Sequence, residues 1–553
     1  MPTESRDVLR VRTTATAGAL CVVLSALAAA QAGDVGVESI RADALKGHVY
    51  FLAAPEMGGR DSLSLEGRIA ANYLAGFFYR LGLKTVGDGG SYFQTFPMSE
   101  STIDRAQTRL RATVTAKAGG TTTARNYVLG SDFTLARQGG TDVDVTAPLV
   151  FAGYGIDAPE YGYNDYAGLD VAGKVVLVLS REPQAADTQS RFLGTWDTFH
   201  AYPSWKPEVA RHRGAAGVLI VQGPPRRPQR LASGPTNGQV RTDRPNHSLT
   251  SPFWDLPVFT IDARVADDLL AGSGKTIADL QSSVDKAGRP QSFEVPGVTI
   301  QMRRAVSERR TVQTRNVVGV IEGTDPKLKD EYVLVTGHYD HVGQKPPIVF
   351  HGADDNASAT AAVIAIAEAF KARPPKRSVM FLVFEAEEDF LQGAFYYADH
   401  PIVPLDRTVA VLNMDMIGRD EESPTWNTKA AENRNSVNVV GTLYSRDLRE
   451  AIERQNKSIG LRLDYKTDND DREGWFQRSD HFPFAIKGIP MVLFNTGENP
   501  DYHTANDTWD RLNYPKMEKI TRLVYLTARE LSEAPARPRF VTQRTTADAA
   551  PRR

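Results

Sequence analysis

The chain of 553 residues contains one cysteine, Cys21, so it cannot form an internal disulfide framework. It also contains no HExxH and no GxSxG motif, which argues against a zincin or a serine hydrolase. Neither sign of charge dominates, because 65 basic residues oppose 67 acidic ones and the formal net charge is −2. Without a global basic field, neither nucleic acid nor an anionic membrane surface is an expected partner.

Long apolar stretches are also scarce, and the one that stands out lies near the start of the chain. Three arginines precede an apolar stretch over residues 15–30, which ends in the small-x-small pattern of Ala30 and Ala32. This pattern predicts a secretory signal peptide over residues 1–32, and a secreted or periplasmic protein without stable membrane association after its removal. An uncleaved membrane anchor is the alternative, but the stretch is shorter than the roughly 20 residues that a spanning helix needs.

What is present is ordinary globular material, with 41% hydrophobic and 24% charged residues in a chain long enough for two or more domains. Residues 33–130 and 301–533 predict one α/β domain, because apolar strands alternate with amphipathic helices. Residues 131–300 predict an inserted β-rich domain, because short apolar runs are separated by long loops rich in Pro, Gly and Arg. Residues 534–553 lack periodicity and predict a disordered tail.

Four apolar runs in the α/β part are predicted to be strands. Each ends where a residue or loop that could bind metal or take part in catalysis begins. They are EYVLVTG, SVMFLVF, TVAVLNM and IPMVLFN. A sheet built from them would carry helices on both faces. In open α/β sheets, ligands bind at the carboxyl ends of the strands. We therefore expect the polar residues that follow these runs to meet at one rim of the sheet.

Five residues with oxygen or nitrogen donors follow these runs or precede a strong helical pattern. They are His338, Asp355, Glu388, Asp415 and His503. A set with three carboxylates, two imidazoles and no thiol suits a pair of hard or borderline divalent ions, and zinc tolerates this mixture of donors. The sequence therefore predicts a dinuclear metal centre.

Each of these residues also has a plainer interpretation. A single histidine after a strand is more often structural, and an aspartate before a helix is often only an N-cap. The order of all five at strand ends is what favours the metal site. Three neighbours, His341, His351 and Asp354, are left out of the predicted ligand set, because residues so close in sequence rarely share one metal.

Six strings carry a more specific resemblance. They are GHYDH, GADDNASATAA, FEAEEDFLQGAFYY, NMDMIG, SDHFPF and YHTANDTWD. From about residue 37 to 531, the chain resembles the co-catalytic zinc aminopeptidases, a family that also contains glutamate carboxypeptidases. The resemblance implies a mixed central sheet with helices on both faces, as in the zinc aminopeptidase and phosphorylase-like fold, and two Zn²⁺ ions. The segment over 131–300 resembles a protease-associated (PA) domain.

The resemblance also implies a role for each predicted ligand. Asp355 would bridge the two metals, and its peptide bond to the next residue is commonly cis in the family. His338 and Asp415 would complete one metal site, whereas Glu388 and His503 would complete the other.

Three further residues receive roles from the same resemblance. Glu387 would be the general base, and Asp340 would orient the histidine two residues before it. Tyr502 matches a tyrosine that hydrogen-bonds the tetrahedral intermediate in some relatives.

The chain departs from the family pattern at three positions without losing a ligand. Ala359 and Phe390 stand where glycines are usual, and Ala394 replaces a serine. Asp480 and His481, in SDHFPF, are candidates for lining the pocket or for packing a loop.

These features predict a secreted zinc-dependent exopeptidase that acts on peptides, specifically an aminopeptidase that uses a hydroxide bridging the metals. A carboxypeptidase or dipeptidase of the same fold stays open, because Arg419, Arg472 and Arg478 could bind a terminal carboxylate. A non-catalytic binding protein on the same scaffold is a third alternative. Side-chain preference and oligomeric state are not predicted.

Overall fold

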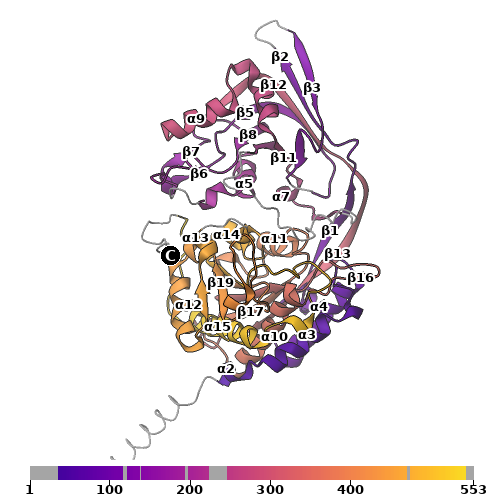
Figure 1. The fold of residues 1–553 in the computed structure, drawn as a ribbon, viewed down its shortest axis with the longest axis vertical. Coiled ribbons are helices and arrows are strands. Elements are labelled where there is room, and N and C mark those ends of the chain that lie inside the picture. The colour runs from indigo at the N-terminus through magenta and orange to yellow at the C-terminus, as the bar shows by residue number, and fades with distance from the viewer. Residues whose placement is uncertain are drawn as a thin grey trace, which may run out of the picture.

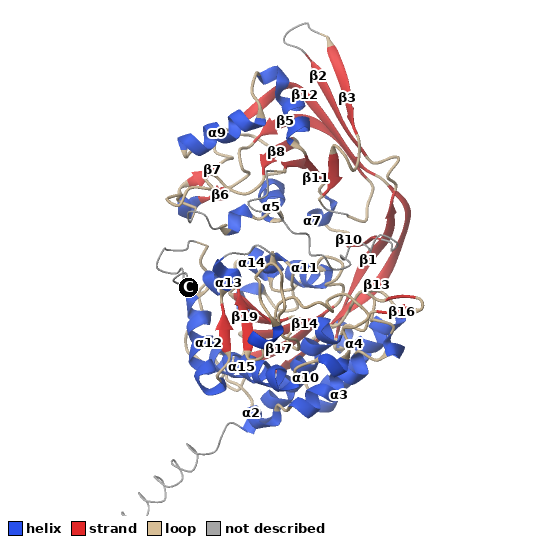
Figure 2. Cartoon of the chain, viewed as in Figure 1, coloured by secondary structure: helices blue, strands red, loops and turns tan. Residues whose placement is uncertain are grey.

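The computed structural model describes residues 35–115, 121–136, 139–192, 197–222, 246–469 and 474–542. The predicted signal peptide and the last eleven residues of the predicted tail lie outside these ranges. Two large sheets dominate the molecule, and helices pack around both (Figure 1, Figure 2). Within the described ranges, no helix combines the length and apolar composition that a membrane crossing requires.

The first sheet has nine strands in the order β10-β1-β13-β17-β14-β18-β21-β19-β20. In that order, the strands are Asn246–Leu249, Phe93–Ile103, Val306–Ile321, Ser378–Phe384, Tyr332–His338, Thr408–Met414, Met491–Asn495, Ser436–Val440 and Arg462–Asp464. Its centre, β17-β14-β18-β21, is parallel, and the flanking pairs β13/β17 and β19/β21 are antiparallel. The predicted mixed sheet is therefore confirmed, and its four parallel strands coincide with the four predicted apolar runs.

Successive side chains of the central strands enter two different cores, as the alternation of a β-strand requires. In β17, the side chains of Val379, Phe381 and Val383 belong to one buried cluster. Met380 and Leu382 belong to a second cluster on the opposite face. Burial on both faces explains why these strands read as continuous apolar runs.

Helices cover both faces of this sheet, as predicted (Figure 1). One face is covered by α3 (Ala42–Leu52), α4 (Leu65–Leu81), α10 (Ala359–Ala372), α12 (Arg446–Ile459) and α15 (Tyr514–Glu533). The other face carries α11 (Gln392–Asp399) and α14 (Phe482–Ile486). The short helix α2 (Val35–Ser39) contacts α10, and the short helix α13 (Lys466–Asn469) contacts β19.

The second sheet has eight strands in the order β3-β2-β12-β5-β8-β9-β11-β4. In that order, the strands are Thr122–Tyr127, Arg109–Thr115, Phe293–Arg304, Val143–Phe151, Val175–Leu179, Gly217–Val221, Val258–Ile261 and Phe133–Leu135. Helices α5 (Trp205–His212), α7 (Pro252–Asp255), α8 (Ala263–Leu270) and α9 (Ile277–Ala287) accompany it. Two-stranded pairs also occur, β6 (Asp157–Ala158) with β7 (Tyr163–Asn164) and β15 (Gln344–Lys345) with β16 (Ile348–Val349).

This sheet begins before residue 131, where the sequence placed the start of the inserted domain. Strand β2 pairs with β12 along Arg109–Val114, so it belongs to the second sheet. The sequence gives little sign of this, because β2 and β3 lie at the sheet edge and keep many side chains exposed. The change in composition therefore comes later in the sequence than the first strand of the second sheet. The domain limits at 33, 131, 301 and 534 stay predictions.

Two long strands and two aromatic contacts join the part built on the first sheet to the part built on the second sheet. Figure 1 shows β1 and β13 as long strands that extend toward the second sheet. On the other side, Tyr202 stacks on Phe476 with ring centroids 5.2 Å apart, and Phe199 meets Tyr444 edge-on at 5.8 Å. Segments from both parts thus share one buried cluster, on the face of the first sheet that carries α11 and α14.

The start of the predicted disordered tail is packed against the folded protein. The buried Arg377 guanidinium donates hydrogen bonds to the backbone carbonyls of Leu531 and Ala534. Farther along, the Phe540 ring stacks on Tyr444 with centroids 5.9 Å apart. The prediction of disorder is therefore wrong for residues 534–542, because it rested on local composition and could not register these long-range contacts.

Replacing Phe540 by alanine should lower the free energy of unfolding by about 1–2 kcal/mol, because one aromatic pair and its buried area are lost. Val541→Ala is the matched control, since the Val541 side chain is 42% exposed and should change stability little. Denaturant unfolding of both variants measures the difference. Equal stability of the two variants would show that the tail does not pack as described.

Candidate metal centre

The candidate centre lies at the carboxyl ends of three adjacent parallel strands. His338 is the last residue of β14, and Asp415 directly follows β18. The loop after β17 carries Glu387 and Glu388. Neighbouring parallel strands end at the same edge, so these four side chains reach one place although up to 77 residues separate them in sequence.

Asp355 and His503 reach the same place from loops. Asp355 lies four residues before α10, and its peptide bond to Asn356 is cis, as the resemblance implied. His503 follows β21 by eight residues and adopts a positive φ of 54°. The structure thus brings all five predicted ligands together, and every one of them is buried.

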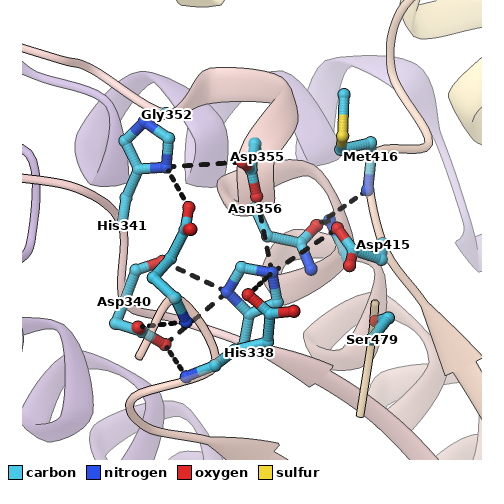
Figure 3. Close-up of polar contacts among 12 residues, drawn as sticks. His338, Asp340, His341, Gly352, Asp355, Asn356, Asp415, Met416 and Ser479 are labelled. Carbon is cyan, nitrogen blue, oxygen red and sulfur yellow. Dashed lines mark hydrogen bonds and ion pairs between the residues drawn. The ribbon is translucent and has the colours of Figure 1, made fainter. Parts of the chain in front are cut away.

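One set of donor atoms surrounds the His338 ring. Its Nε2 atom lies 3.4 Å from Asp355 Oδ1, 3.4 Å from Asp415 Oδ1 and 3.7 Å from Glu387 Oε2. Figure 3 shows His338, Asp355 and Asp415 converging in this way. His338, Glu387 and Asp415 are close enough to hold one metal ion.

A second set surrounds the His503 ring. Its Nε2 atom lies 2.7 Å from Asp355 Oδ2 and 3.0 Å from Glu388 Oε1. The Nδ1 atom of His341 lies 3.1 Å from the same Glu388 oxygen and 3.6 Å from Asp355 Oδ2 (Figure 3). These four residues also form a group that could hold a metal ion. His341, which the sequence argument set aside, therefore lies in the centre.

The two sets meet at the Asp355 carboxylate, because Oδ1 faces the first set and Oδ2 faces the second. Its backbone is fixed by Asp507, whose carboxylate accepts hydrogen bonds from the N–H groups of Asp354 and Asp355. A carboxylate held with one oxygen toward each set has the arrangement needed to bridge two cations.

Two buried atoms test whether these residues fit a cation. Among the described residues, His338 Nε2 and Asp415 Oδ1 are buried and have no hydrogen-bond partner. A buried polar atom without a hydrogen bond costs free energy, and a cation would relieve that cost at both atoms. Nitrogen and carboxylate oxygen donors without thiols are the donors that zinc accepts in catalytic sites. The residues therefore fit divalent metal ions.

The pKa shifts of the buried residues at the centre also favour the binding of cations. Burial raises the pKa of Glu387 well above its usual range, and the Asp415 and Glu388 carboxylates raise it further against the opposing effect of His338. Burial alone would lower the pKa of His503, but the Glu388 and Asp355 carboxylates raise it to about 9. Crowded acidic groups of this kind favour the binding of cations.

Asp340 holds the loop that carries the two glutamates. Its Oδ1 accepts a hydrogen bond from Glu387 N–H at 3.1 Å, and its Oδ2 accepts one from Glu388 N–H at 3.2 Å. The Nδ1 atom of His338 lies 3.2 Å from the Asp340 carbonyl oxygen and 3.6 Å from its carboxylate. Asp340 thus contacts the histidine chiefly through its backbone, and its carboxylate serves mainly the glutamate loop.

Tyr502 lies beside the second set, with its ring centroid 3.9 Å from that of His503. Its hydroxyl accepts a hydrogen bond from Arg478, which also pairs with Glu498 at 2.9 Å. This arginine could not be predicted as a neighbour of the tyrosine, because 24 residues separate the two in sequence.

Asp480 and His481 are fully buried at the side of the centre. Among the described residues, neither carboxylate oxygen of Asp480 and neither ring nitrogen of His481 has a hydrogen-bond partner. The charges of His338 and Asp415 act on Asp480, so it lies near the first set of donors. Whether these two residues contact substrate stays a prediction.

One departure from the family pattern, Phe390, lies in a loop that the inserted segment supports. Phe390 has a φ of 71° and a side chain that is 59% exposed, so the backbone keeps the left-handed conformation that favours glycine. Gln392 accepts a hydrogen bond from the Leu249 N–H of β10. His247, also in β10, lies 3.0 Å from Asp389.

Comparison with known proteins agrees with this geometry. Residues 316–528 match the profile of peptidase family M28, and residues 145–269 match that of the PA domain. The chain is 27% identical to aminopeptidase YwaD of Bacillus subtilis (strain 168) over 43% of this chain and 49% of that protein. It is 30% identical to the probable leucine aminopeptidase 2 of Aspergillus oryzae over 42% of this chain and 47% of that protein.

The matched stretch thus spans about half the length of these two curated relatives. Among solved structures, an aminopeptidase from Aneurinibacillus sp. strain AM-1 matches with 18% identity and a TM-score of 0.44. That match covers 93% of this chain and 98% of the other.

Arg60 joins the loops on either side of the centre, and sequence reasoning missed it because its partners are distant along the chain. Its fully buried guanidinium donates hydrogen bonds to four backbone carbonyls. They belong to Leu52, Tyr339, His351 and Gly352. The last three flank His338 and Asp355 in sequence.

Replacing Arg60 by methionine should lower the free energy of unfolding of the metal-free protein by about 3 kcal/mol or more, because several buried carbonyls lose their donors. Arg68→Met is the matched control, since the Arg68 side chain is exposed and, within the described part of the chain, donates one hydrogen bond, to the Leu63 carbonyl. Denaturant unfolding in the presence of a chelator compares the two. A loss no larger than that of the control would contradict the bridging role.

Proposed function

Since the chain contains a peptidase family M28 domain with an inserted PA domain, we propose that this protein is a secreted, zinc-dependent exopeptidase, and specifically an aminopeptidase. The relatives named above as aminopeptidases support the reaction, and the peptidase family implies peptide substrates. Export would use the signal peptide predicted over residues 1–32.

The observation that carries the proposal is the orientation of the Asp355 carboxylate between two sets of donors. His338 and Asp415 would hold one Zn²⁺ ion with Asp355, and Glu388 and His503 would hold the other. Paired divalent ions lower the pKa of water toward neutrality and polarise a carbonyl oxygen, which are the two requirements of amide hydrolysis.

Glu387 is the residue best placed to move the proton. Its carboxylate lies 3.7 Å from His338, and its backbone is held by Asp340. In the proposed reaction, it accepts a proton from the attacking water and returns it to the departing amine, so one carboxylate serves as base and then as acid. Tyr502, which Arg478 holds through its hydroxyl oxygen, would donate a hydrogen bond to the oxygen of the tetrahedral species.

The choice of an aminopeptidase over a carboxypeptidase or dipeptidase has support from two arginines. Arg419 is paired with Asp501 at 2.7 Å, and Arg478 is paired with Glu498 at 2.9 Å. Guanidinium groups already paired with carboxylates are poorer receptors for a terminal carboxylate of the substrate. The third candidate, Arg472, lies outside the described residues.

A binding protein without activity is disfavoured, because the chain keeps all five candidate ligands and Glu387 in one buried place. Loss of catalysis on such a scaffold would normally be accompanied by loss of a ligand or of the base.

Metal analysis of the purified mature protein should find two zinc ions per chain, and the loaded protein should hydrolyse aminoacyl anilides but not N-blocked dipeptides. A chelator should abolish the activity, and added zinc should restore it. If the protein cleaves N-blocked dipeptides and leaves aminoacyl anilides uncleaved, the result would instead favour the carboxypeptidase or dipeptidase. A protein that holds no divalent ion would contradict the whole proposal.

Glu387→Gln should leave the zinc content near normal and lower kcat by about 100-fold or more, because general acid–base catalysis contributes at least this factor. The exposed Glu422 offers a matched control, and Glu422→Gln should keep the activity of the natural protein. Steady-state kinetics with parallel zinc analysis measures both effects. Unchanged turnover in zinc-loaded Glu387→Gln would refute the role of the base.

A further inference from the structure

We propose that His341 is a fourth protein ligand of the cation held by Asp355, Glu388 and His503, so that the two metal sites are not equivalent. The inference rests on the proposed metal centre and adds a ligand that the five predicted residues do not include. It also assigns the two sites different tasks.

His341 lies three residues after His338, and its backbone is held by the segment that contains Arg60 and Asp61. Its N–H donates to the Arg60 carbonyl, and it forms an isolated bridge with Asp61. Its side chain is fully buried, as is that of His338. Although three residues apart, the two rings serve different sets of donors, since neither His338 nor His341 belongs to both groups. The sequence objection to neighbouring ligands therefore does not apply.

The distances around His341 are close to the edges of a coordination tetrahedron, or somewhat shorter. Donors bound to zinc at about 2.0–2.2 Å in a tetrahedron lie about 3.3–3.6 Å apart. His341 Nδ1 lies 3.1 Å from Glu388 Oε1 and 3.6 Å from Asp355 Oδ2. His503 Nε2 lies 3.0 Å and 2.7 Å from the same two oxygens. Both imidazoles thus face the same pair of carboxylate oxygens.

The site beside His338 has fewer protein side chains available as metal ligands. His338, Asp355 and Asp415 provide three, and the nearby Glu387 is needed to move a proton. Zinc sites closed by four protein ligands are typically structural, whereas catalytic sites keep a position open. We therefore assign tight retention to the cation beside His341, and the more exchangeable, substrate-facing position to the cation beside His338.

The competing interpretation is a hydrogen bond from His341 to Glu388 without metal contact. Such an outer contact would orient the glutamate, and its loss would typically change metal affinity by about 10- to 100-fold. The two interpretations differ in the number of imidazoles bound to zinc, which is three for two ions if His341 is a ligand and two if it is not.

X-ray absorption spectroscopy at the zinc edge counts bound imidazoles in the tag-free, zinc-loaded protein. The natural protein should show three imidazoles for each pair of zinc ions, and His341→Ala should show two. His351→Ala is the matched control, because His351 lies in the neighbouring loop, contacts the Ala53 carbonyl and belongs to neither set of donors. This control should keep three.

Chelator competition gives a second readout that does not depend on activity. In the natural protein, one zinc ion should be lost well before the other, whereas His341→Ala should lose the two ions at similar chelator concentrations. Two imidazoles in the natural protein, or an unchanged order of loss in the variant, would overturn the inference while leaving the proposed peptidase intact. Failure of the natural protein to bind zinc would overturn both, and the count in the natural protein decides even if a variant does not fold.

Discussion

A single buried carboxylate, that of Asp355, faces two sets of donors at once, and the arrangement of the whole site follows from this. Burial and the neighbouring Glu388 carboxylate together raise its pKa to about 7, against the opposing effect of His503. Acidic groups packed this closely are unfavourable unless cations compensate them. The fold therefore has to supply rigid support for the acidic groups, and the proposed zinc ions would supply the charge.

The support comes from segments that are far apart in the sequence. Parallel strands β17, β14 and β18 end side by side and place His338, the glutamate loop and Asp415 at one rim. Around them, Asp340 fixes the glutamate loop, Asp507 fixes the backbone of Asp355, and Arg60 joins the loops between them. The inserted part adds β10, whose His247 contacts Asp389 in the loop after Glu388 and whose Leu249 N–H donates to Gln392 at the start of α11. The site thus depends on contacts from both parts of the molecule.

Much of the first sheet could be predicted from sequence, because its parallel strands are buried on both faces and appear as unbroken apolar runs. The candidate ligands could be predicted because each follows such a run or precedes α10. His341 could not be included, since its distance from His338 in sequence says nothing about which set of donors it faces. Sequence patterns also could not predict the roles of Arg60 and Asp507, because both contact backbone groups that are more than 100 residues away. The packing of Phe540 could not be predicted either, because it depends on a long-range contact. Strand β2, which lies next to the edge strand β3, was missed because its exposed side chains give a weak apolar pattern.

The most direct test of the account is a crystal structure of the zinc-loaded protein with anomalous scattering measured at the zinc edge. We expect two anomalous peaks about 3.5–4 Å apart, one on each side of the Asp355 carboxylate. One peak should lie beside His338 and Asp415, and the other beside Glu388 and His503. No peak at Asp355, or a single peak bound by only one of the two sets, would contradict the account.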